Sequence, residues 1–121
     1  MSFRESLESL VTQIDGAIGA VIMGYDGIAI DEYIRDDEAL DVQLLAVEYA
    51  TLLKEIKRTV DVLQTGAMEE VSISTGEVRI AIRAISEEFF IVLLLQADGN
   101  FGMGRYLLRL HAPRLRDELH Q

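Results

Sequence analysis

The sequence predicts an α+β fold, an α/β sandwich in which helices cover a five-stranded antiparallel sheet in the order α-β-β-α-β-β-β-α. Three segments carry apolar residues at helical spacing, and five short runs are either apolar throughout or alternating, as strands are. Turns containing Gly separate most of these runs. The length of 121 residues suits one hydrophobic core, so we expect residues 1–121 to form a single domain.

The N-terminal segment has the apolar spacing of a short amphipathic helix, which we expect to end at Gly16. Ser2 and Glu5 stand at the spacing of a capping box. The runs AIGAVIMG at 17–24 and IAIDEYI at 28–34 are joined by Tyr-Asp-Gly. Two apolar runs with such a turn between them predict a β-hairpin.

The second half of the chain begins with a long helix that Asp41 is placed to cap and that runs to about Leu63. Alternating runs at 68–74 and 78–86 then predict a second hairpin, and FFIVLLL at 89–95 predicts the fifth strand. Runs that are apolar on both faces suit the centre of a sheet, whereas polar runs suit its edges. We therefore expect the first and last strands at the centre, and the second and third strands at the edges.

A loop rich in Gly, QADGNFGMG, is predicted before the last helix at 104–120. Pro113 lies inside this helix, where it removes one backbone hydrogen bond, so we expect a kink or a break there. Gly99, Gly102 and Gly104 have neither the spacing of a P-loop nor that of a dinucleotide fingerprint, and we interpret them as turn residues.

The net charge of −10 comes from 21 acidic and 11 basic residues, which argues against nucleic acid or an anionic membrane as a general partner. The absence of Cys excludes a disulfide framework and a thiolate nucleophile. The start of the chain lacks the pattern of a signal peptide, and the longest apolar run, 89–95, is too short to span a bilayer. We expect a cytoplasmic protein without a cofactor.

Apolar residues surround nearly the whole first half of the long helix. One stripe is wide enough to cover a sheet, and it contains Val42, Leu45, Tyr49, Leu52, Leu53, Ile56, Val60 and Leu63. Leu44 and Val47 lie on the opposite side. Isolated exposed apolar residues are common, but a row of them on a helix that already has a core stripe is more typical of a protein–protein contact.

We therefore expect a two-fold homodimer in which the long helices meet and the edge strands at 68–74 join the two sheets. The expected dimer interface consists of Leu44, Val47, Ala50, Thr51, Val71 and Ile73.

Several motifs resemble the roadblock/dynein light-chain family: DGAIGAVIMGYDGIAID, the long apolar helix, the hairpin MEEVSIS/VRIAIRAIS, and FFIVLLL before GMGRYLLRLH. The resemblance spans nearly the whole chain and is strongest to the bacterial branch of MglB-type partners of a small Ras-like GTPase. Pro113 and the end of the chain at Gln121 depart from the MglB pattern.

The resemblance implies a homodimer and a non-enzymatic role, in which the protein binds a GTPase and positions that enzyme's own catalytic residues. It also implies that the solvent-facing side of the long helix is the docking surface. The expected GTPase-binding residues are Glu48, Lys54, Glu55 and Arg58. Two alternatives are an adaptor or scaffold subunit that leaves GTP hydrolysis unchanged and, from another class, a small-molecule sensor with a pocket against the sheet.

Other chemistry has weaker support. The acidic residues Asp36, Asp37, Glu38 and Asp41 could hold a divalent cation, but they lack EF-hand spacing, and a solvated loop with a helix cap is the better interpretation. His111 and His120 have no third metal ligand nearby in the sequence, so no metal site is expected.

Arg79 and Arg83 share one face of a predicted strand. One of them could act in trans as an arginine finger on a GTPase. The alternative is that they pair with acidic residues of a neighbouring helix, such as Glu5 or Glu8, while their stems cover the sheet.

Overall fold

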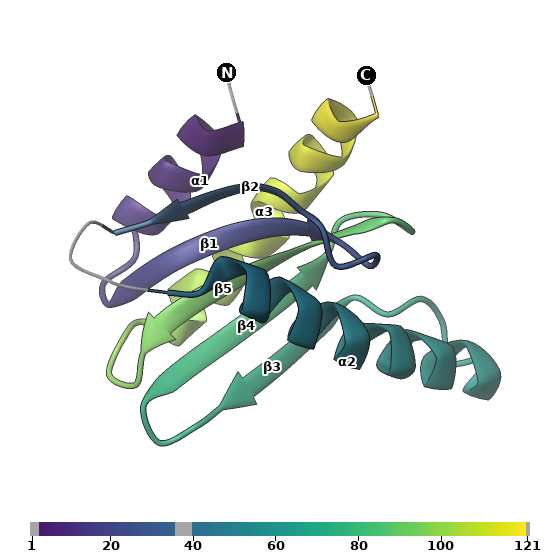
Figure 1. Ribbon diagram of the computed structural model, residues 1–121. Coiled ribbons are helices and arrows are strands. Elements are labelled where there is room, and N and C mark those ends of the chain that lie inside the picture. The colour runs from purple at the N-terminus through teal and green to yellow at the C-terminus, as the bar shows by residue number, and fades with distance from the viewer. Residues whose placement is uncertain (1–2, 36–39, 121) are drawn as a thin grey trace.

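The computed structural model describes residues 3–35 and 40–120. The order α-β-β-α-β-β-β-α is confirmed (Figure 1). The elements are α1 (Phe3–Thr12), β1 (Ala17–Gly24), β2 (Ala29–Ile34), α2 (Val42–Leu63), β3 (Glu70–Ser74), β4 (Val78–Ala84), β5 (Phe89–Gln96) and α3 (Phe101–Leu119). No helix among the described residues is both long enough and apolar enough to cross a membrane.

The five strands form one antiparallel sheet in the order β2-β1-β5-β4-β3. Every residue of β1 is buried, as are six of the eight residues of β5, which confirms the prediction that the two most apolar strands lie at the centre. The more polar strands β2 and β3 lie at the edges, also as predicted. Each edge strand pairs with a single neighbour, so the outer side of β3 has no partner strand within the described part of the chain.

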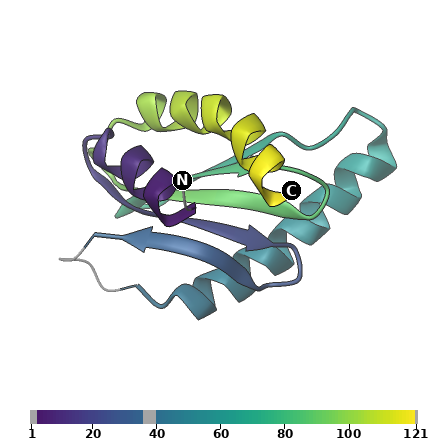
Figure 2. The same ribbon diagram turned by 90° about the horizontal axis from the view of Figure 1, so that it is seen from above.

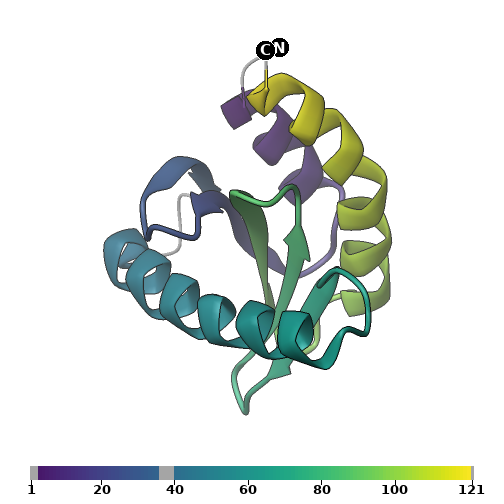
Figure 3. The ribbon, with the colours of Figure 1, turned by 90° about the vertical axis from the view of Figure 1, so that its right-hand side faces the viewer.

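Helices cover both faces of the sheet, so helices and sheet together form three layers (Figures 2 and 3). Helix α2 lies on one face, while α1 and α3 lie on the other (Figure 3). The core is divided accordingly. Alternate strand side chains such as Val21, Ile82 and Val92 join the α2 side, and Ile22, Ala81 and Leu93 join the α1/α3 side.

The turn between α1 and β1 crosses close to the turn before α3. Gly16 has a φ of 82°, a conformation that L side chains rarely adopt, and a Cβ added to it would lie 2.5 Å from Cα of Gly99. The backbone N–H of Asn100 donates to the carbonyl of Asp15 at 2.8 Å. Glycine at both positions therefore lets two segments that are distant in the sequence touch.

The last helix differs from the prediction. It begins at Phe101 rather than at 104, because the side chain of Asn100 caps it by accepting a hydrogen bond from the N–H of Met103 at 3.1 Å. Gly102 and Gly104 are therefore helical, and interpreting them as turn residues was wrong. Gly104 is buried, and a Cβ there would lie 2.8 Å from a methyl group of Leu93, so the missing side chain lets α3 approach the sheet.

Pro113 does not break α3, which continues to Leu119. The helix axis changes direction along its length (Figure 2), the kink that was one of the two predicted outcomes.

Two predicted features fall on residues outside the described part of the chain: the Ser2 cap, and the acidic loop at Asp36, Asp37 and Glu38.

Candidate functional site

Helix α2 is the element to which the sequence assigns the contacts with other proteins, and both of its ends are fixed. The carboxylate of Asp41 accepts a hydrogen bond from the N–H of Leu44 at 3.0 Å, so the predicted cap is confirmed. The helix ends at Gln64, which takes a left-handed conformation with φ 55°. Its 22 residues form a rod of about 33 Å.

Two alanines and one leucine are the most buried residues on the inner face of α2. Ala46, Ala50 and Leu53 are the buried residues of the helix, each at most 2% exposed. Placing Ala50 in the dimer interface was therefore wrong, because its methyl group faces the sheet of its own protomer. The predicted stripe is confirmed for Val42, Leu45, Tyr49, Leu53 and Ile56, which pack against this core layer. It was wrong for Leu52 and Leu63, which are 43% and 65% exposed. The buried stripe is rotated toward the two alanines.

The outer face of α2 carries the predicted apolar row. Leu44 is 58% exposed and Val47 is 54% exposed, so both project away from the core. Thr51 is also exposed, and its hydroxyl donates to the carbonyl of Val47 at 2.9 Å. This hydrogen bond satisfies the hydroxyl within the helix and leaves the methyl group of Thr51 as a further apolar contact.

The edge strand β3 adds two partly buried side chains to this region. Val71 and Ile73 pack against the same core layer that contains Ala50 and Leu53. They therefore lie on the α2 side of the sheet, next to the unpaired edge of the described strands. Exposed apolar residues on a helix and an open strand edge on the same side of the sheet are surfaces that two copies of a chain can share.

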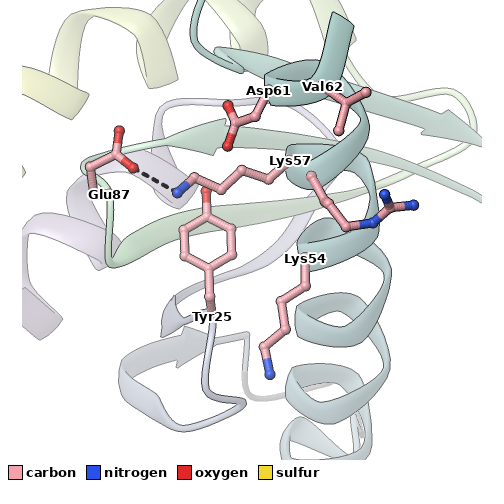
Figure 4. Close-up of a pocket in the computed structure, with 7 residues that line it drawn as sticks. Tyr25, Lys54, Lys57, Asp61, Val62 and Glu87 are labelled. Carbon is pink, nitrogen blue, oxygen red and sulfur yellow. Dashed lines mark hydrogen bonds and ion pairs between the residues drawn. The ribbon is translucent and has the colours of Figure 1, made fainter.

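The four predicted GTPase-binding residues are all exposed, but the structure brings only some of them together. Lys54 and Arg58 line a cavity of about 470 Å³ that opens beside the second half of α2 (Figure 4). Glu55 lies next to this cavity, and its carboxylate is 3.4 Å from the guanidinium of Arg58. Glu48 is near the start of the helix and does not line the cavity.

Five further residues line the same cavity and were not predicted as site residues: Tyr25, Lys57, Asp61, Val62 and Glu87. Tyr25 comes from the turn after β1, Lys57 from α2, and Glu87 from the turn before β5 (Figure 4). The ammonium of Lys57 is 2.6 Å from the carboxylate of Glu87 and 5.4 Å from the centre of the Tyr25 ring. These residues are far apart in the sequence and share no motif, so no signal in the sequence could have brought them together.

The cluster has distinct electrostatics. The hydrogen bond from Lys57 lowers the pKa of Glu87, so this ion pair persists below the ordinary range for carboxyl groups. Burial, with a smaller contribution from Glu87, raises the pKa of Tyr25 to about 12. The phenol oxygen of Tyr25 is buried, and no hydrogen-bond partner for it occurs among the described residues.

These groups do not form catalytic machinery. The cation of Lys57 is already paired, and burial moves the pKa of the Tyr25 phenol further from neutrality, to about 12, so its ionised form is less accessible than that of an ordinary tyrosine. Nor do the described residues contain a group of three His, Cys, Asp or Glu that could hold a metal ion. Burial and the nearby Arg114 lower the pKa of His111, which therefore favours its neutral form.

The two strand arginines are not placed alike. Arg79 donates to the carbonyls of Thr75 and Val78, at 2.7 and 3.3 Å, so the structure holds it against the β3–β4 turn. Arg83 lies opposite Glu70 of β3 and lowers the pKa of that carboxyl, although the hydrogen bond from Arg105 contributes more. Neither arrangement uses the predicted partners on α1.

Comparison with solved structures gives strong matches. MglC from Myxococcus xanthus is 46% identical, the match covers 98% of this chain and 99% of that chain, and the TM-score is 0.71. A roadblock/LC7 domain from Streptomyces avermitilis has a TM-score of 0.87 over the full length of both chains at 12% identity. An MglB with a tetrameric arrangement has a TM-score of 0.84 at 16% identity, covering 93% of this chain and 84% of that one.

A scan against protein-family models and a search of curated proteins gave no match. The two matches of low identity show a shared fold, whereas the MglC match shows kinship along almost the whole chain. The element order, the α2 cover and the MglC relative confirm the resemblance seen in the sequence: the chain belongs to the roadblock family.

Proposed function

We propose that this protein is a two-fold homodimer that regulates a small Ras-like GTPase by binding it, and that it contributes no catalytic group of its own. The observation that carries the proposal is the exposed apolar row on α2, on the side of the sheet to which the unpaired edge strand β3 also contributes Val71 and Ile73. The resemblance of the sequence to MglB-type proteins supplies the class of partner.

The dimer interface follows from where apolar surface is exposed. Leu44, Val47 and Thr51 form a strip along the outer face of the first half of α2, and Val71 and Ile73 flank the open strand edge. Two copies related by a two-fold axis would each cover the other's strip, and pairing of the β3 edges would join their sheets. The tetrameric arrangement of one MglB shows that this fold can self-associate in a related protein.

The GTPase would meet the charged part of the same helix. Lys54, Glu55 and Arg58 are exposed and lie in the second half of α2, beyond the apolar strip. Glu48 borders the strip itself. A surface of mixed charge suits a transient protein contact, because such charges steer association and favour one partner over others.

An adaptor that binds without altering hydrolysis is the second candidate function. Identity to MglC is 46%, whereas identity to the tetrameric MglB is 16%. An activity of the MglB type therefore does not follow from sequence kinship, and kinetics must distinguish the two roles.

The test is single-turnover GTP hydrolysis by the Ras-like GTPase encoded nearest this gene, with and without this protein. We expect binding that depends on GTP. A rate increase of at least tenfold, about 1.4 kcal/mol in the barrier, would identify an activator, and an unchanged rate would identify the adaptor. Lys54→Glu with Arg58→Glu should weaken binding, whereas the control Arg114→Glu on α3 should not. The absence of any binding would overturn the proposal.

A further inference from the structure

The outer surface of α3 has a composition that the fold does not require. Met103, Tyr106 and Leu110 are 41%, 48% and 54% exposed and stand at i, i+3 and i+7, so they form one apolar crest along the helix. The opposite side of α3 already covers the sheet with residues that include Gly104, Leu108 and Leu115. The packing of α3 on the sheet therefore does not depend on the residues of the crest.

A basic hollow lies along one side of this crest. Arg105 and Arg109 of α3, Arg83 of β4 and Glu70 of β3 line a cavity of about 210 Å³, together with Gly102 and Tyr106. The hollow carries three arginines and one carboxylate, in a chain whose net charge is −10. A local excess of positive charge on a strongly acidic protein selects an acidic partner.

The three arginines of the hollow differ in how many of their side-chain hydrogen-bond donors already have a partner. Arg105 makes two hydrogen bonds to the Glu70 carboxylate, at 3.0 and 2.7 Å, and this pair fixes one wall. Arg109 lies 5.9 Å from the centre of the Tyr106 ring, and Arg83 is half-buried beside Glu70. Among the described residues, no side-chain hydrogen bond is donated by the guanidinium of Arg83 or by that of Arg109, so each retains donors for an incoming carboxylate.

We propose that the α3 surface formed by Met103, Tyr106, Leu110, Arg83 and Arg109 binds an acidic amphipathic segment of a partner protein. The apolar side chains of the segment would pack against Met103, Tyr106 and Leu110, as the apolar face of an amphipathic helix does on its partner. Its carboxylates would accept paired hydrogen bonds from the guanidinium groups of Arg83 and Arg109. Exposed Tyr and Arg side chains are the types that contribute most to protein–protein binding energy. This surface is on the opposite side of the sheet from α2, so the proposal is independent of the proposed GTPase contact (Figure 3).

The test measures fluorescence anisotropy of labelled helical peptides of about 15 residues. The probe peptide has Leu at i, i+3, i+4 and i+7 with Glu on the flanks. A scrambled peptide of the same composition and a peptide with Lys in place of Glu are the controls. We expect the wild-type protein to bind the probe but neither control, and we expect its affinity to fall between about 50 and about 200 mM salt.

Two double variants with the same change in net charge separate the surfaces. Arg83→Glu with Arg109→Glu should lower affinity for the probe at least tenfold, and it leaves the Arg105–Glu70 pair in place. Lys54→Glu with Arg58→Glu on α2 should leave the affinity unchanged. Because Arg83 is half-buried, Arg109→Glu alone repeats the test on an exposed residue if the double variant fails to fold.

Three outcomes would overturn the proposal. The first is that the probe does not bind. The second is a lack of specificity, seen either as equal affinity for the probe and the scrambled peptide or as an equal loss of probe affinity in the two double variants. The third is binding to phosphatidylserine vesicles, but not to the probe, that is lost with Arg83→Glu and Arg109→Glu, because it would assign the surface to a membrane.

Discussion

Helices α2 and α3 cover opposite faces of one sheet, yet they bury different residues and expose different surfaces. Helix α2 buries two alanines and one leucine, whereas α3 buries three leucines together with Gly104 and Ala112. On α2, Leu45, Tyr49 and Ile56 pack partly buried against the core, while Leu44, Val47 and Leu52 remain exposed. Helix α3 uses most of its large side chains inward, and its outer surface is dominated by arginines.

Exposed apolar residues on the two helices therefore indicate different kinds of binding partner. On α2, Leu44 and Val47 are exposed on the side of the sheet to which the open edge strand β3 also contributes Val71 and Ile73, and that edge can pair only with an extended strand such as that of a second copy. On α3, Tyr106 and Leu110 lie beside a hollow lined by arginines, which favours a partner rich in carboxylates. The surroundings of each row, rather than its hydrophobicity, indicate the kind of partner.

The largest effect is expected from opening a cavity under either helix. Leu53→Ala removes a fully buried side chain below α2, and Leu108→Ala removes one below α3. We expect each to lower the free energy of unfolding by about 2 to 5 kcal/mol, measured by urea denaturation at one fixed protein concentration. A loss of less than about 1 kcal/mol for Leu53→Ala alone would mean that α2 is held less firmly than α3.

The next effect tests whether the α2 row is the dimer interface. Leu44→Asp with Val47→Asp places two charges in the expected contact and should weaken self-association at least a hundredfold, about 2.7 kcal/mol. Light scattering at micromolar concentration should then give the mass of a monomer, while Lys54→Glu should still give a dimer. A monomeric wild-type protein, or a dimer unaffected by the two aspartates, would contradict this interface.

A smaller effect concerns the ion pair under the α3 surface. The hydrogen bond from Arg105 lowers the pKa of Glu70, so the folded state favours the carboxylate. The resulting stabilisation is fully present above the ordinary pKa of 4.5 and is lost as pH falls through the lowered pKa.

Glu70→Gln should therefore reduce stability at about pH 6 and make the decline of stability below pH 4.5 less steep, as measured by urea denaturation across this range. The effect should be smaller than that of either cavity, because the pair is partly solvated. Glu77→Gln, at an exposed turn, is the matched control. If both variants gave the same profile, the pair would make no special contribution.

The smallest effect is expected at Tyr25 beside α2. Its phenol oxygen is buried without a partner in the described part of the chain, so Tyr25→Phe should leave stability unchanged or raise it by up to about 1 kcal/mol. The variant should also lose the tyrosinate absorbance step near pH 12. Tyr106→Phe, at an exposed site, controls for the loss of one tyrosine. A clear destabilisation would mean that water or another group satisfies the hydroxyl.

The sequence by itself determined the order of the elements and the arrangement of the sheet. Strands apolar on both faces, such as 17–24, can only be central, and the Tyr-Asp-Gly turn fixes a hairpin. Asp41 as a cap and the exposure of Leu44 and Val47 also followed from local pattern and helical period. These features depend on neighbouring residues, so periodicity reveals them.

The tertiary structure alone decided which side of α2 is buried and where α3 begins. Ala50 faces the sheet because its small side chain lets α2 approach the strands closely. A helical pattern based on large apolar residues does not predict this. Gly104 lies inside the helix that Asn100 caps, and its missing side chain leaves room for Leu93. The cluster of Tyr25, Lys57 and Glu87 and the hollow beneath Arg109 join elements distant in the sequence, and only the folded chain brings those elements together.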